Sequence, residues 1–188
     1  MYLTDKNKNF ESDFEEAKKQ LKELHDYNSV FEELDRPFEA QSSMHIDNNA
    51  FMQKQLLISE IQGKQEITHK LNSLVYNIGW LKSAIIIKDD IIINKAINNI
   101  LKHENTSINA IVSELNSLKN KIDKFENLHM NLLKNSISLD AKTLLEQDFR
   151  KNHKNLNNLH NKQKSVLTNL SSIFVKLTKD SVIKNKNK

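Results

Sequence analysis

The stretch 83–96, "SAIIIKDDIIINKA", decides the fold, because two runs of three isoleucines flank one lysine and two aspartates. In isolation the stretch fits two buried β-strands joined by a turn, the middle of one long helix, or the tip of a helical hairpin. The apolar pattern on either side of it chooses between these structures.

Apolar residues recur at alternating steps of four and three on both sides of this stretch. On the N-terminal side they are Ile67, Leu71, Leu74, Ile78, Leu81 and Ile85. On the C-terminal side the same face comprises Ile111, Leu115, Leu118, Ile122, Phe125, His129 and Leu132. Residues 10–34 and 145–177 show the same alternation. This spacing places the apolar side chains on one face of an α-helix and argues against strands.

The two neighbouring patterns do not share one register. Carried forward, the first pattern lands mostly on polar residues such as Lys88 and Lys95, and carried backward, the second reaches Asp90. A lysine at position 88 suits a helix C-terminus, while Asp89 and Asp90 suit the next N-terminus and either can act as its N-cap. We therefore predict a helix–turn–helix tip at residues 88–90.

Two alternatives for the stretch stay open at this point. A continuous helix through residue 89 fits the lack of a glycine that would end the first helix. It would move the break to residues 103–107, where Thr106 or Ser107 can cap the following helix. A β-hairpin is the third alternative, and the flanking helical periodicity disfavours it.

Composition sets the fold class independently. The 188 residues include two Gly, one Pro and no Cys. A β-sandwich or barrel needs turn residues at short, regular intervals, and this chain has too few. The absence of Cys excludes disulfides and thiolate metal ligands. Gly63 and Gly79 fall inside a predicted helix at a cost of about 1 kcal/mol each relative to Ala, which close packing of another helix would explain.

We predict an all-α fold, an elongated antiparallel bundle of three to four long helices with coiled-coil-like heptad packing. The expected organisation is a single helical-bundle domain over residues 1–188. The expected helices span residues 10–36, 47–88, 90–134 and 140–180, followed by a frayed basic tail at 181–188.

Charge is unevenly distributed along the chain. Residues 1–40 carry 11 acidic and 6 basic side chains, whereas residues 135–188 carry 4 acidic and 11 basic ones. A candidate binding surface in the last predicted helix comprises Arg150, Lys151, Lys154, Lys162 and Lys164. These residues would complement the acidic first helix, contact a partner protein, or bind the phosphates of nucleic acid or an anionic membrane.

No constellation of residues indicates catalysis. The seven histidines include no pair at i, i+4, and the nucleotide-binding and nucleophile motifs that require clustered glycines are absent. We interpret His153 and His160 as solvated or rim residues and His129, on the apolar face, as a satisfied core histidine. We expect no catalytic residues, no cofactor and no metal site, and hence no enzyme.

The leading hypothesis is a non-catalytic helical protein–protein interaction module: an adaptor, an assembly subunit, or a bacterial secretion chaperone or effector. The predicted tip adds Ile86, Ile87, Ile91 and Ile92 as a candidate docking surface. The expected partner is another protein, and a homo-oligomer stays open; electrostatic binding of nucleic acid or anionic membrane through the basic residues is the alternative. With no Sec-type signal or transmembrane segment, we expect a cytoplasmic protein or one exported by a signal-independent route.

Overall fold

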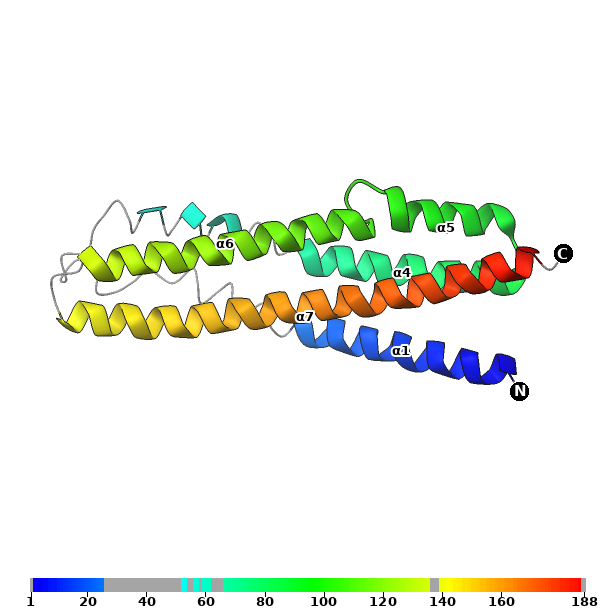
Figure 1. Cartoon of the computed structure of the whole chain (residues 1–188), viewed down its shortest axis with the longest axis horizontal. Coiled ribbons are helices and arrows are strands. Elements are labelled where there is room, and N and C mark those ends of the chain that lie inside the picture. Colours follow the sequence, from blue (N-terminus) through cyan, green and yellow to red (C-terminus); the bar gives the residue numbers. More distant parts are fainter. Residues whose placement is uncertain are drawn as a thin grey trace. The chain divides into compact units, whose positions relative to one another are not determined.

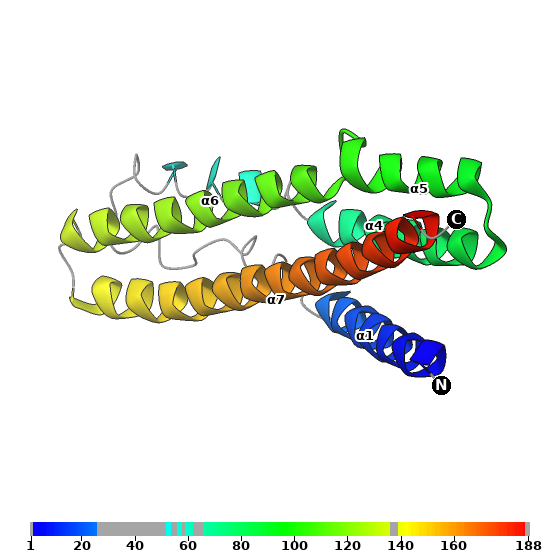
Figure 2. The same ribbon diagram turned by 45° about the vertical axis from the view of Figure 1, so that its right-hand side comes forward.

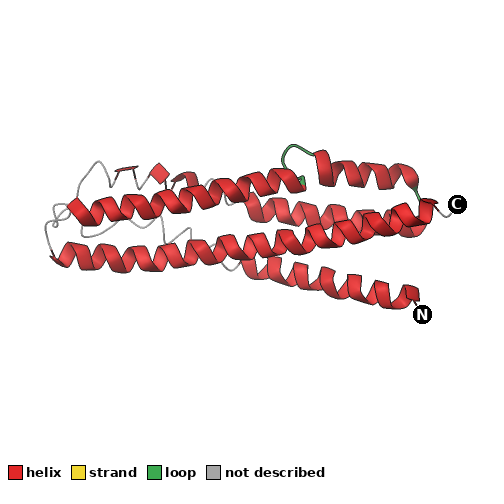
Figure 3. Cartoon of the chain, viewed as in Figure 1, coloured by secondary structure: helices red, strands yellow, loops and turns green. Residues whose placement is uncertain are grey.

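The regular structure of the described chain is helical (Figures 1 and 3). The computed structural model describes residues 2–25, 52–53, 56–57, 59–61, 66–135 and 139–186. The helices with full bounds are α1 (Tyr2–His25), α4 (Glu66–Ile87), α5 (Asp90–Lys102), α6 (Ile108–Asn135) and α7 (Leu139–Lys186). No strand occurs in the described ranges, so the all-α prediction is confirmed and the β-hairpin alternative is wrong.

Contacts between residues divide the chain into two compact units. The first unit contains Met1–His25, Ile67–Glu114 and Lys162–Lys188. The second unit contains Asp26–Glu66 and Leu115–Asn161. Helices α6 and α7 contribute residues to both units, and each unit has buried apolar residues of its own.

In the first unit, α1 runs antiparallel to α4. Glu11 forms an ion pair with Lys82, and Phe14 lies beside Gly79, where a Cβ atom would be 3.5 Å from the Phe14 Cζ atom. Residue numbers therefore rise along α1 as they fall along α4. The packing predicted for a helical glycine is observed at Gly79, whereas Gly63 lies outside the described residues.

Helix α1 also runs antiparallel to the first-unit part of α7. Lys176 Nζ lies 3.5 Å from Asp13 Oδ2, and Asn169 Nδ2 donates a hydrogen bond of 2.9 Å to Gln20 Oε1. The contact between Asp13 and Lys176 is of the kind that charge complementarity between an acidic first helix and a basic last helix predicts.

The core of the first unit consists of the apolar faces read from the sequence. Its buried members include Phe14, Ala17, Leu21 and Leu24 of α1, Ile67, Leu71, Leu74, Ile78 and Leu81 of α4, Ile111 of α6, and Val166, Leu170 and Ile173 of α7. Full burial of a Leu or Ile side chain contributes about 1.5–3 kcal/mol. The predicted face fails at its end, because Ala84 is buried and Ile85 is only half-buried.

In the second unit, α6 and the first part of α7 run antiparallel and side by side (Figures 1 and 2). His160 Nε2 donates a hydrogen bond of 3.1 Å to the Leu115 carbonyl oxygen, and His153 lies near Glu126 further along both helices. The buried apolar residues of this unit include Leu57, Ile61, Leu115, Leu118, Ile122, Phe125, Leu132, Leu156 and Leu159.

The predicted turn at residues 88–90 is confirmed. Lys88 has φ of 58°, in the left-handed region that non-glycine residues rarely adopt. The Lys88 N–H donates to the Ile85 carbonyl oxygen at 3.2 Å, and the Asp89 N–H donates to the Ala84 carbonyl oxygen at 3.1 Å. These two hydrogen bonds form a Schellman motif, with lysine at the position where glycine is usual.

Asp89 ends one helix and begins the next. Its Oδ1 atom accepts hydrogen bonds from the N–H groups of Ile91, at 3.1 Å, and Ile92, at 3.2 Å. This N-cap satisfies two donors that the first turn of α5 leaves without a helical partner. The corner between α4 and α5 therefore needs no additional loop residues.

The expected helix at 90–134 is wrong in one respect, because the chain also breaks between α5 and α6. His103 Nδ1 accepts from the N–H groups of Asn105, at 3.2 Å, and Thr106, at 3.3 Å, which turns the chain out of α5. Ser107 Oγ then accepts from the Ala110 N–H at 3.1 Å and caps α6. The break that the continuous-helix alternative required is thus present in addition to the turn at 88–89.

Other helix bounds also differ from expectation. Helix α1 begins at Tyr2 and not near residue 10, because residues 2–9 lack Gly and Pro and can be helical without an apolar face. Helix α7 begins at Leu139 and continues to Lys186, beyond the expected end at 180. The expected end of the first helix at 36 and the expected start of the second at 47 lie outside the described residues.

Replacement of Lys88 by glycine should stabilise the protein. A left-handed conformation costs a side-chain-bearing residue roughly 1–2 kcal/mol, part of which returns as the greater entropy of glycine in the unfolded chain. We expect Lys88→Gly to raise the free energy of unfolding by about 1 kcal/mol and the Tm by about 2–4 °C in thermal unfolding. Lys95→Gly, at an exposed position inside α5, should lower both, and a decrease in both variants would contradict the left-handed geometry.

Candidate functional site

The apolar corner, defined by Ile86, Ile87 and Ile91, lies at the junction of α4 and α5 in the first unit. These side chains are 67%, 65% and 71% exposed, respectively. Ile92, the fourth residue predicted for this surface, is half-buried. Ile86 and Ile87 end α4 off its buried face, and Ile91 begins α5 off the face that buries Ala96 and Ile100. The predicted exposure is observed at three of four residues, and a docking role stays a prediction.

The basic residues predicted as a binding surface are divided between the two units. The second-unit part of α7 carries Arg150, Lys151 and Lys154, and the first-unit part carries Lys162 and Lys164. Arg150 Nη2 lies 3.0 Å from Glu146 Oε1, and both Lys151 and Lys162 take part in interactions of their own. Each unit thus holds a small set of these cations, and their role in binding phosphates stays a prediction.

His160 and His129 are both buried, although of these two only His129 was expected in the core. His160 was expected to be solvated or at the rim, but it is 8% exposed and hydrogen-bonded to the backbone of α6. The expectation is wrong because His160 follows Leu159 on the side of α7 that faces α6. His129 is 1% exposed, as expected for a core residue.

The ring of Phe149 stacks with two imidazoles in the second unit. The ring centroids of Phe149 and His129 are 3.9 Å apart with planes 5° from parallel, and those of Phe149 and His153 are 4.8 Å apart at 27°. Glu146 lies 3.9 Å from His129 Nε2, and Glu126 lies 3.9 Å from His153 Nε2. Within the described ranges, no three His, Asp or Glu side chains gather to hold a metal ion.

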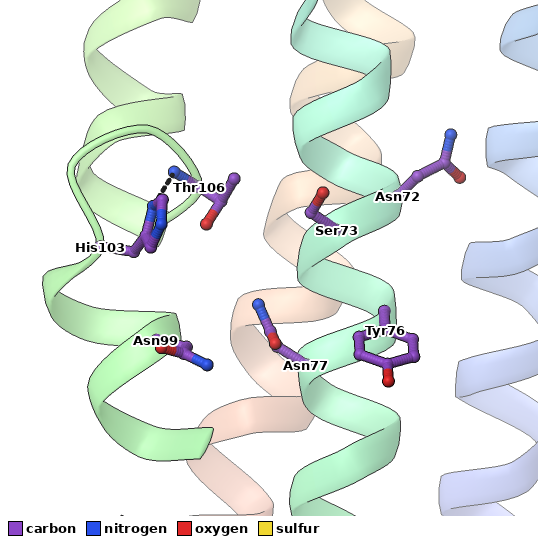
Figure 4. Close-up of a pocket in the computed structure, with 7 residues that line it drawn as sticks. All are labelled: Asn72, Ser73, Tyr76, Asn77, Asn99, His103 and Thr106. Atoms are coloured by element: carbon purple, nitrogen blue, oxygen red, sulfur yellow. Dashed lines mark hydrogen bonds between the residues drawn. The ribbon is translucent and has the colours of Figure 1, made fainter. Parts of the chain in front are cut away.

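A cavity of about 570 Å³ lies between α4 and the α5–α6 connection in the first unit (Figure 4). It is lined by Asn72, Ser73, Tyr76, Asn77, Asn99, His103 and Thr106. Figure 4 shows Asn77 on α4 and Asn99 on α5, with His103 beside Thr106. Ser73 Oγ donates to the His69 carbonyl oxygen at 3.2 Å, so its hydroxyl hydrogen is directed to the backbone and not to an imidazole that could act as a base.

A second cavity in the first unit, of about 480 Å³, lies between α1 and α4. Its lining residues are Phe14, Lys18, Asn72, Val75, Tyr76, Gly79, Trp80 and Ser83. The rings of Phe14 and Phe10 stack with centroids 5.4 Å apart, and Lys82 Nζ lies 4.1 Å from the centroid of Phe10. Burial lowers the pKa of Lys82 although Glu11 is its ion-pair partner.

The sequence did not predict this second cavity. The sequence feature that marks this cavity is the pair Gly79–Trp80, in which the residue without a side chain directly precedes the residue with the largest side chain in one apolar helix. The position of Phe14 opposite that pair depends on how α1 packs on α4, and the periodicity of either helix does not contain this information.

Comparisons with known proteins give no relative: no family model, no curated protein and no solved structure matches this chain. Among the helices of the described chain, none combines the length and the apolar character that a membrane span requires.

The lowered pKa of Lys82 gives the stability a pH dependence. The folded state releases this proton at a lower pH than the unfolded chain, whose ordinary value is 10.5, so the unfolded state binds more protons in the interval just below that value. The free energy of unfolding should therefore rise with pH through this interval. In Lys82→Met, which keeps an unbranched chain over Phe10, we expect that rise to be smaller in denaturant unfolding at a series of pH values. Lys19→Met is the control, and an equal loss in both variants would contradict the assignment.

The electrostatic alternative for the basic residues makes its own prediction. A surface that neutralises phosphates should bind duplex DNA or phosphatidylserine vesicles at low salt, with affinity falling as salt rises. Exchange of Lys151, Lys154, Lys162 and Lys164 for Glu should abolish that binding, as measured by fluorescence anisotropy or vesicle sedimentation. Absence of wild-type binding at low salt would eliminate the alternative.

Proposed function

We propose that this chain is a non-catalytic helical module that binds another protein, built as an antiparallel bundle of three to four long helices with coiled-coil-like heptad packing. The apolar corner is the observation that carries the proposal. Ile86, Ile87 and Ile91 remain 65–71% exposed within six residues of one another. Full burial of such a side chain contributes about 1.5–3 kcal/mol. The fold does not bury these three side chains, so a partner that covers them would obtain this free energy on binding.

The bundle architecture is supported by the direction of the helix contacts. Glu11 meets Lys82 between α1 and α4, and His160 meets Leu115 between α6 and α7, both as expected for antiparallel neighbours. Buried residues on each of these helices recur at steps of three and four, which is the spacing of a helix that buries one face.

The backbone of the corner is well suited to present these isoleucines. The Schellman hydrogen bonds fix the end of α4, and the Asp89 N-cap fixes the start of α5. A surface that is ordered before binding loses less conformational entropy when a partner covers it. Lys88 is exposed beside the isoleucines and Asp90 at the first turn of α5, which places charges at the edge of an apolar centre, as in many protein interfaces.

Charged substitutions at the apolar corner test the proposal. In Ile86→Lys/Ile87→Lys/Ile91→Glu the new charges match the dipoles at the end of α4 and the start of α5, so the free energy of unfolding should stay within about 0.5 kcal/mol of wild type. When each protein is cross-linked and the products are identified by mass spectrometry, we expect wild type to yield a cross-linked partner protein and the triple variant to yield none.

A matched control separates the corner from general surface hydrophobicity. Leu101→Lys/Val112→Lys/Val175→Lys also replaces three exposed apolar residues of the first unit, and it should retain the partner. Equal retention by wild type and the corner variant would reject the proposal. If light scattering instead shows wild-type dimers that the corner variant lacks, the corner binds a second copy and not another protein.

A further inference from the structure

The cavity between α4 and the α5–α6 connection is lined by side chains that form hydrogen bonds. We refer to it as the polar cleft, defined by three asparagines together with Ser73, Tyr76, His103 and Thr106. Its volume of about 570 Å³ falls within the range of roughly 300–1,000 Å³ that is usual for small-molecule sites. The chemistry of the lining indicates which class of molecule the cleft can bind.

The ring of His103 is held in one tautomer by the backbone of the α5–α6 connection. Its Nδ1 atom accepts hydrogen bonds from the N–H groups of Asn105, at 3.2 Å, and Thr106, at 3.3 Å. A ring nitrogen that accepts carries no proton, so the proton of the neutral ring is on Nε2. His103 therefore brings an oriented, uncharged N–H donor to the polar cleft.

Two asparagines supply amide groups from different helices. Figure 4 shows Asn77 on α4 and Asn99 on α5 with their amides directed toward one another across the cleft. Both side chains are half-buried, and within the described chain neither amide has a hydrogen bond to another residue. Each amide combines two N–H donors with an oxygen acceptor, so a bound molecule can donate to it and accept from it at once.

Ser73 contributes an acceptor. Its hydroxyl hydrogen is directed to the His69 carbonyl oxygen, so the oxygen has only lone pairs to offer to a ligand. The cleft thus combines a donor in His103, an acceptor in Ser73, and amides that are both. A hydroxyl group donates and accepts through a single atom, and a molecule with hydroxyl groups on adjacent carbons therefore matches this mixture.

The lining disfavours the other classes of ligand. Among the described residues that line the cleft there is no Lys or Arg to pair with a phosphate or carboxylate, and no Asp or Glu to pair with a cation. An apolar ligand would remove water from the amides without replacing its hydrogen bonds, which is costly. A neutral, polar ligand remains.

Tyr76 favours a sugar among neutral polar ligands. Its side chain is 72% exposed and lies on the outer side of α4, at the edge of the cleft (Figure 4). The face of an aromatic ring is electronegative and attracts the weakly positive C–H groups of a saturated ring. A sugar ring presents such C–H groups on its faces and hydroxyl groups around its edge, so it can contact Tyr76 and the amides together.

We propose that the polar cleft binds a neutral sugar residue, whose hydroxyl groups form hydrogen bonds with Asn77, Asn99 and His103. One C–H face of the sugar lies against the ring of Tyr76. This inference goes beyond the proposed function, because it concerns a different class of ligand and a surface that does not include the apolar corner.

Titration of the ¹⁵N-labelled protein with a panel of neutral sugars tests the inference. The panel comprises glucose, galactose, mannose and N-acetylglucosamine, each as the free sugar and as the methyl glycoside. We expect saturable NMR shifts in the side-chain amides of Asn77 and Asn99 and in the backbone amides of Asn105 and Thr106, which hold His103. Cyclohexanol, which lacks adjacent hydroxyl groups, should cause no saturable shift, and glucuronate should bind more weakly than glucose.

Matched substitutions locate the binding. Asn99→Ala removes one hydrogen-bonding group and should weaken binding by about fivefold, whereas Asn98→Ala, the same change at the neighbouring exposed position, should not alter it. Tyr76→Ala should weaken binding, and Tyr76→Phe, which keeps the ring, should retain it. Alanine is favourable inside a helix and these side chains lie outside the core, so all four variants should fold as wild type.

Three results would overturn the inference. They are the absence of saturable shifts across the whole panel, equal affinity of Asn98→Ala and Asn99→Ala for the sugar, and tighter binding of a nucleoside than of any sugar. Equal binding of a sugar and its methyl glycoside would support a sugar attached to another molecule, and binding of the free sugar alone would support a free sugar. Sugar binding should persist in the Ile86→Lys/Ile87→Lys/Ile91→Glu variant, so failure of one proposal is distinguished from failure of the other.

Discussion

Burial of one aliphatic face per helix is the constraint on which the described structure depends. Residues such as Leu74 of α4, Ile122 of α6 and Leu170 of α7 are fully buried, and each lies three or four positions from the next buried residue of its helix. A helix of 13 residues such as α5 is marginal in water on its own, so it depends on Ala96 and Ile100 being covered by its neighbours. The ion pairs at the edges of the helices are mostly exposed, so they contribute little stability and mainly favour one direction of a helix relative to its neighbour.

Polar residues inside this apolar core determine how the helices align. His160 uses a ring N–H to satisfy the Leu115 carbonyl oxygen, and Gln163 Nε2 donates to Thr68 Oγ1 at 3.4 Å. Within the described chain, Gln163 Oε1 is buried without a hydrogen-bond partner, which carries a desolvation cost of about 1–3 kcal/mol. A shift of α7 along its neighbours by one turn would break both hydrogen bonds, so these residues favour one register at some cost in stability.

The apolar corner and the cavity between α1 and α4 are surfaces that the core leaves uncovered. At the corner, Ile86 and Ile87 lie off the buried face of α4, the left-handed Lys88 ends that helix, and Ile91 lies off the buried face of α5. At the cavity between α1 and α4, Phe14 of α1 lies against Gly79, where a Cβ atom would be 3.5 Å from Phe14 Cζ. The first surface could be predicted from register alone, because the turn is encoded by neighbouring residues. The second could not, because it needs the position of Phe14, which lies 65 residues away in sequence.

By itself, the sequence determined the helical class, the buried faces, and the turn after Ile87, because all of these follow from residue spacing, the scarcity of Gly and Pro, and local capping by Asp89. The sequence also contains the residues that form the break between α5 and α6, His103 and Ser107, although we predicted a break either there or at residues 88–90 and not at both. Only the tertiary structure decided that His160 is buried, that the basic residues of α7 are divided between two units, and that a cavity lies beside Trp80. Periodicity shows which side of a helix is covered, whereas the identity of the covering helix depends on contacts between residues far apart in the chain.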